Sequence, residues 1–129
     1  MRKQGFTVIE IIIVAAFLIA AGIVLLFQIQ RMSAEQINMQ KKTAINAIYY
    51  SLEEYFHPKH GYYPERIEKD TLPTMDSELL TDPDGVMIGE GSSAYRYEPK
   101  QCSDGKCASY SLRAILINED DFVKKSRHN

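Results

Sequence analysis

The sequence has little of what usually marks an enzyme or a nucleic-acid-binding protein. It contains no G-x-S-x-G, no phosphate-binding glycine loop and no nucleophile with a plausible base. Its 129 residues carry a formal net charge of only −2, so overall charge gives no argument for binding nucleic acid or a membrane surface. Tryptophan is absent, although there are eight tyrosines. We therefore expect a protein that is not an enzyme and needs no cofactor.

Cysteine is equally scarce, with only Cys102 and Cys107 in the chain. A structural zinc site needs four ligands, and no others lie nearby in the sequence. Two close cysteines in an exported region favour a disulfide. The sequence therefore predicts a Cys102–Cys107 disulfide and no metal at this position.

One long hydrophobic run dominates the N-terminal part of the chain. Residues 6–27 form a stretch of 22 residues in which Thr7 and Glu10 are the only clearly polar members. As a helix it would be roughly 33 Å long, which is enough to span a bilayer core. Arg2 and Lys3 precede it and would hold its start on the cytoplasmic side. We expect a single-pass transmembrane segment, with the rest of the chain outside.

Glu10 is anomalous within this run, because a carboxylate in a membrane helix is costly and usually functional. A simple alternative is that Glu10 lies near the headgroups and reaches water. Cleavage after Gly5 would place a new amine on Phe6, and buried charges of opposite sign need partners. Within one helix the two groups lie about 6 Å apart along the axis. A neighbouring subunit that is shifted along the axis can bring its Phe6 amine to this carboxylate, and is therefore the better partner for Glu10.

The order of Gly5, Phe6, a three-residue spacer, Glu10 and a long apolar run resembles the prepilin signal of type IV pilins and pseudopilins. The resemblance implies that a membrane peptidase removes a leader of residues 1–5 and methylates the Phe6 amine. It also implies that Glu10 neutralises the Phe6 terminus of the adjacent subunit during assembly. An ordinary secretory signal differs, because it is cut after its apolar region.

The helical pattern continues beyond the apolar run. Apolar residues recur at spacings of three and four from Ile45 to Phe56, with polar residues on the other side. No proline or glycine interrupts the chain between Ile23 and His57, and the pattern breaks at His57-Pro58. We predict one helix from residue 6 to about residue 56, with an amphipathic half over residues 28–57. The proline that many pilins carry near the end of the apolar run is missing here.

Residues 58–129 are expected to form a small globular head. A wrapped loop is predicted to residue 91, with a short helical turn near 76–80. Alternating residues predict two strands at 95–99 and 108–116, joined by a turn that the cysteines close. Residues 120–129 look like a polar tail. The predicted fold class is α+β, a long N-terminal helix with a small antiparallel sheet packed on it, which again resembles pilins and pseudopilins.

Three polar groups in the head are candidate binding sites. Asp82 and Asp84 are weak calcium candidates, raised slightly by the calcium site of major pseudopilins, but turn chemistry is the default interpretation. His57 and His60 flank a proline and fit a solvated helix end better than a metal site. The basic tail 124–128 gives only a weak phosphate-binding signal, so nucleic acid stays an open partner.

The resemblance implies a structural subunit that polymerises with copies of itself. Its other partners would be the prepilin peptidase, a platform protein and an assembly ATPase. It would begin as a precursor in the cytoplasmic membrane and end in an extracellular or cell-surface filament. The alternatives are a pseudopilin of type II secretion, a competence pilin that takes up DNA, and a membrane-anchored binding module that never polymerises. Glu10 was expected to separate that module from the others, because a simple anchor has no use for the carboxylate.

Overall fold

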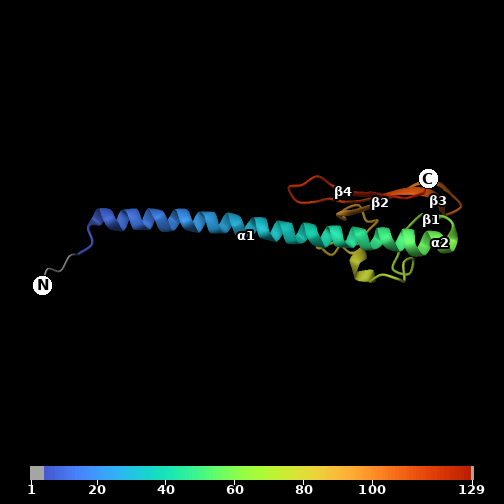
Figure 1. The fold of residues 1–129 in the computed structure, drawn as a ribbon, viewed down its shortest axis with the longest axis horizontal. Coiled ribbons are helices and arrows are strands. Elements are labelled where there is room, and N and C mark those ends of the chain that lie inside the picture. Colours follow the sequence, from blue (N-terminus) through green and yellow to red (C-terminus); the bar gives the residue numbers. More distant parts are fainter. Residues whose placement is uncertain (1–4, 129) are drawn as a thin grey trace. The chain divides into compact units, whose positions relative to one another are not determined.

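The computed structural model describes residues 5–128, so Arg2, Lys3 and the other residues before Gly5 lie outside the described part. The chain is α+β, as predicted: a long N-terminal helix and a small antiparallel sheet that packs against its C-terminal part (Figure 1). It divides into two compact units, one ending at Glu35 and the other beginning at Gln36.

The first unit contains the apolar part of α1 (Val8–Tyr50). Between residues 5 and 35 no side chain is buried, and almost all are exposed. An 18-residue window of the helix reaches a mean hydropathy of 3.0 with none of it buried. The helix is therefore long and apolar enough to cross a membrane, which agrees with the segment expected at residues 6–27.

The second unit begins within α1, where the helix becomes amphipathic. Its buried face repeats at spacings of three and four, and consists of Asn38, Lys41, Ala44, Ile45 and Ile48. Its apolar members belong to the core of the head, which also contains apolar residues from the next helical turns, the loop, the sheet and the segment after β3: Leu52, Phe56, Tyr63, Ile67, Leu72, Leu80, Ile88, Tyr95, Cys107, Tyr110, Leu112, Ala114 and Leu116. The helix thus supplies one wall of the head core.

The helix ends later than predicted. After Tyr50 it continues as a π-helix, η1 (Ser51–Phe56), and then as one further turn, α2 (His57–His60). Pro58 is tolerated because it lies in the first turn of α2, where its missing N–H is least needed. Gly61 ends the helix at a φ of 79°, and its N–H donates to the His57 carbonyl at 2.7 Å.

The sheet has four strands, two more than predicted: β1 (Tyr63–Pro64), β2 (Tyr95–Ser103), β3 (Lys106–Ala114) and β4 (Phe122–Lys125). β3 is central, with β2 along one side and both β1 and β4 along the other. The two predicted strands correspond to β2 and β3. The prediction of a polar tail at 120–129 is wrong, because Phe122 packs on the core and Lys124 lies over the Tyr49 ring.

The loop between β1 and β2 wraps the helix and is anchored by its buried leucines and isoleucines. It includes the predicted helical turn, a 3-10 helix η2 (Ser77–Leu80). The Asp76 side chain accepts a hydrogen bond from the Glu78 N–H at 3.0 Å and so caps this turn.

Candidate functional site

The start of the long helix is capped by Thr7 and Glu10. The Thr7 N–H donates to Glu10 Oε2 at 3.0 Å, and the Glu10 N–H donates to Thr7 Oγ1 at 3.4 Å. The Thr7 hydroxyl is also 3.3 Å from Oε2. These reciprocal contacts form a capping box, in which two free backbone donors of the first turn gain acceptors. The T-x-x-E spacing of Thr7 and Glu10 is the sequence pattern of a capping box, and the sequence analysis did not predict it.

Because of the capping box, the presence of Glu10 does not distinguish a filament subunit from a simple membrane anchor. A carboxylate that caps its own helix has a role in a single chain, so the expectation that a simple anchor has no use for it is wrong. Both side-chain contacts of Glu10 use Oε2. Among residues 5–128, none forms a hydrogen bond with Oε1, so this oxygen is open to a further donor.

Gly5 and Phe6 precede the capped turn. Phe6 is 81% exposed, and a Cβ placed on Gly5 would meet nothing within 4 Å. The φ of Gly5 is not in the left-handed range that favours glycine. The fold therefore gives no reason for a glycine here. This is the position at which the resemblance to pilins requires one.

In the head, Cys102 and Cys107 form the predicted disulfide, with an S–S distance of 2.01 Å. The two residues are directly paired across β2 and β3, with Cα atoms 4.0 Å apart. The hairpin turns at Asp104 and Gly105, which have φ values of 53° and 76°. Two successive positive φ values are typical of a type I′ turn. The bond closes this end of the sheet.

Asp82 organises the loop that leads into β2. Its buried carboxylate accepts the N–H groups of Asp84 at 3.0 Å and Val86 at 2.9 Å on Oδ1, and of Ala94 at 2.8 Å on Oδ2. Asp84, the second calcium candidate, is exposed. Within the described residues there is no group of three or more His, Cys, Asp or Glu side chains arranged for a metal. Asp82 thus performs the turn chemistry that was the default interpretation.

A polar cluster around Glu53 lies inside the head and was missed from the sequence. The buried Glu53 carboxylate accepts hydrogen bonds from the hydroxyls of Tyr63 at 2.9 Å and Tyr110 at 2.8 Å. It also accepts the N–H of Arg127 at 3.1 Å. Burial, and then these hydrogen bonds, raise the pKa of Tyr63 and Tyr110 well above the usual range. In the sequence, nothing distinguishes Glu53 from its exposed neighbour Glu54.

The basic tail is folded against the helix. Arg127 forms an ion pair with Glu54 at 2.6 Å and donates to the Tyr49 hydroxyl at 3.1 Å. His57 stacks on His128, with ring centroids 4.2 Å apart, rather than facing His60. The H-x-x-H pair is therefore not assembled as a site, and Arg127 is partly neutralised.

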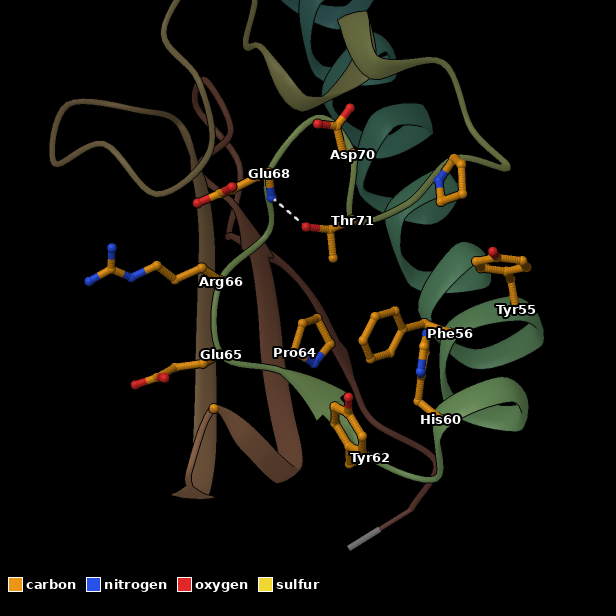
Figure 2. A pocket seen from close by; sticks show the side chains of 12 residues that line it. Tyr55, Phe56, His60, Tyr62, Pro64, Glu65, Arg66, Glu68, Asp70 and Thr71 are labelled. Carbon is orange, nitrogen blue, oxygen red and sulfur yellow. Dashed lines mark hydrogen bonds between the residues drawn. The ribbon is translucent and has the colours of Figure 1, made fainter.

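A pocket of about 500 Å³ lies between the end of the helix and segment 64–73 (Figure 2). The rings of Phe56 and Pro64 point toward one another, while Glu65 and Arg66 point away (Figure 2). Rings therefore form one side of this pocket, whose lining also includes His60, Glu68 and Asp70.

Comparison of the chain with protein-family models, with curated proteins and with solved structures finds no match in any of the three.

Proposed function

We propose that this chain is a structural subunit of a type IV pilus-like filament, anchored in the membrane before assembly and held in the filament by its N-terminal helix. The observation that carries the proposal is the apolar helix with a single carboxylate near its start. Its side chains are exposed all round from residue 6 to residue 20, so they need lipid or other helices as partners. Such helices at the centre of a filament bury that surface.

Assembly would depend on a contact between subunits at the helix start. Cleavage after Gly5 gives Phe6 a free amine, and the open oxygen of Glu10 offers it an acceptor in a neighbouring subunit. The pair neutralises two charges that are costly in an apolar setting. Because the donor and the acceptor lie at different heights, the contact shifts each copy along the axis. It is therefore heterologous and repeats without closing.

Processing is tested by mass spectrometry of the protein from its native membrane. We expect a mature chain that begins at Phe6 with one methyl group on its nitrogen. Gly5→Leu should leave the uncut precursor, whereas Gly22→Leu, the same change within the apolar helix, should still be cut. A mature protein that starts at Met1, or after Phe27, would contradict the proposal.

A membrane-anchored binding module that never polymerises is the second candidate. It is favoured by the capping box, which gives Glu10 a use within one chain. Electron microscopy of sheared surface material separates the two candidates, because only the first predicts fibres. If fibres form, deletion of the gene assigns their system through the function that is lost: surface pili, type II secretion or DNA uptake.

A further inference from the structure

A groove of about 590 Å³ runs along the head between the helix and the η2 loop. We call it the helix groove. Its lining is mostly apolar and includes Ala47, Tyr50, Met75 and Leu79. Tyr50 is 51% exposed. The groove lies wholly within the head unit.

The loop wall of the helix groove is negatively charged. Asp76 lines the groove, and Glu78 is a second exposed carboxylate on the same loop. Residues 74–79 contain no basic residue. Neither carboxylate takes part in an ion pair with any residue between 5 and 128. On the helix wall, Glu54 is already paired with Arg127 of the same chain. A partner for the groove should therefore combine an apolar side chain with positive charge.

The head itself offers one surface of that kind. Apart from Tyr50, its exposed large apolar residues are Met39, Ile115, Ile117 and Val123. Ile115 and Ile117 precede the acidic run 119–121. The exposed positive charges near these residues and near Met39 are already paired within the chain, Lys42 with Glu119 and Arg113 with Glu98 and Asp121. Val123, 45% exposed, is followed by Lys124 and Lys125 and lies on β4, which pairs only with β3 within the described chain.

We propose that the helix groove of one copy receives the free edge of β4 from a second copy, with Val123 in the groove and Lys125 facing Asp76 and Glu78. This inference rests on the proposed function and names the contact between neighbouring heads. Lys125 is exposed and forms no ion pair among the described residues, so its charge is available.

Both surfaces are available in the same copy. Within the head, β4 and η2 lie on opposite sides of the helix (Figure 1). The basic side chains of the C-terminal segment contact Tyr49, Tyr50, Glu54 and Phe122 instead of the loop wall. One copy can therefore use its groove and its β4 edge at once, toward two different neighbours.

Cross-linking of two tagged full-length copies in the native membrane tests the contact. One copy carries Leu79→Cys and the other Val123→Cys, while Cys102 and Cys107 stay oxidised and unreactive. A short bismaleimide should then join the two tags. The matched control replaces Val123→Cys by Ile117→Cys, which is also exposed and apolar but has an acidic flank, and it should give little product.

Charge-reversal variants provide a second test in the same cross-linking experiment. Lys125→Glu on the Val123→Cys copy should lower the yield of cross-linked product about tenfold, because it turns attraction into repulsion. Glu78→Lys on the Leu79→Cys copy should do the same, and the two reversed copies together should recover the yield. Lys100→Glu, an equal change at an exposed position of β2, should have no effect.

The outcomes separate this inference from the filament proposal. Cross-linking without fibres would support the head contact and contradict the filament. Fibres without the Leu79–Val123 product, and with normal assembly of Lys125→Glu, would overturn the head contact alone. If Lys125→Glu instead abolishes retention of DNA and no product ever forms, β4 is a nucleic-acid surface and the head contact is wrong.

Discussion

The Glu53 carboxylate accepts a hydrogen bond from the Tyr110 hydroxyl at 2.8 Å, although the two residues are 57 positions apart. The contact joins the π-helical turn η1 to the central strand β3. Because the same carboxylate also accepts from Tyr63 and from the Arg127 N–H, it ties the start of the sheet and the C-terminal segment to the helix as well. Glu53 is thus the polar centre of the head.

Replacing Glu53 should destabilise the head strongly. Glu53→Ala leaves two buried hydroxyls and one backbone donor without their acceptor, and we expect a loss of about 2–4 kcal/mol in the free energy of unfolding. Glu53→Gln keeps one acceptor and should lose less. The control is Glu54→Ala, which removes an exposed ion pair worth less than about 1 kcal/mol. Denaturant unfolding of the full chain in detergent measures both variants, and equal losses would contradict the role of Glu53.

The tyrosines predict an alkaline limit to stability. Burial raises the pKa of Tyr63, Tyr97 and Tyr110 above the usual range, and burial followed by the Asp82 charge raises the pKa of Tyr95 to about 12. In the unfolded chain a tyrosine titrates near about 10. Above that pH the unfolded state has lost protons that the folded state keeps, so the free energy of unfolding falls as the pH rises.

The measurement is the free energy of unfolding between about pH 9 and pH 12, recorded together with the ultraviolet absorbance of tyrosinate. Stability should be constant below about pH 10 and then decrease, with these tyrosines ionising as the head unfolds. Tyr95→Phe removes one late-titrating group and should make the decrease shallower. Ionisation of all four near about pH 10 in a folded head would refute this prediction.

The disulfide should contribute modestly, because it closes a small loop at the end of a hairpin that the β2–β3 ladder already holds. The chain-entropy estimate for such a loop is about 2 kcal/mol. Replacing both Cys102 and Cys107 by serine should lower the unfolding midpoint without unfolding the head at low temperature. Alkylation of the exported protein without reductant should label neither thiol, and full labelling would show that the bond is not formed in the cell.

Periodic burial could be predicted from the sequence, whereas polar contacts between distant segments could not. Ile45, Ile48 and Leu52 repeat with helical spacing, and the alternation of β2 and β3 is plain, so the α+β fold followed from the pattern. β4 was missed because its inward positions include Lys124, whose stem and ammonium lie over aromatic rings rather than in water.

Among the candidate sites too, those formed by residues close in the sequence could be predicted, and the one formed by distant residues could not. The disulfide was predictable because the chain has only two cysteines, which lie close together and have no further zinc ligands nearby in the sequence. The capping box follows from the T-x-x-E spacing of Thr7 and Glu10, but the sequence prediction placed the Glu10 carboxylate against water or another subunit and not against Thr7 of its own helix. Glu53 could not have been found, since its partners lie 10, 57 and 74 residues away.

Glu10→Gln tests whether the charge of Glu10 pairs with the Phe6 amine of a neighbouring subunit. Glutamine serves in a capping box as glutamate does, so the helix start and the membrane level of the protein should be preserved. The charge is lost, and removal of one member of a buried pair costs about 3–5 kcal/mol. Thr7→Ala is the reverse control: it weakens the cap by about 1 kcal/mol and keeps the charge, so it should still assemble.

The decisive measurement is the number of fibres per cell, seen by electron microscopy, with Glu10→Gln as the sole subunit and its membrane level matched to that of the wild type. The filament account predicts few or no fibres from Glu10→Gln and abundant fibres from Thr7→Ala. Fibres of Glu10→Gln at wild-type abundance would contradict the account, and would leave Glu10 as the cap of a membrane helix.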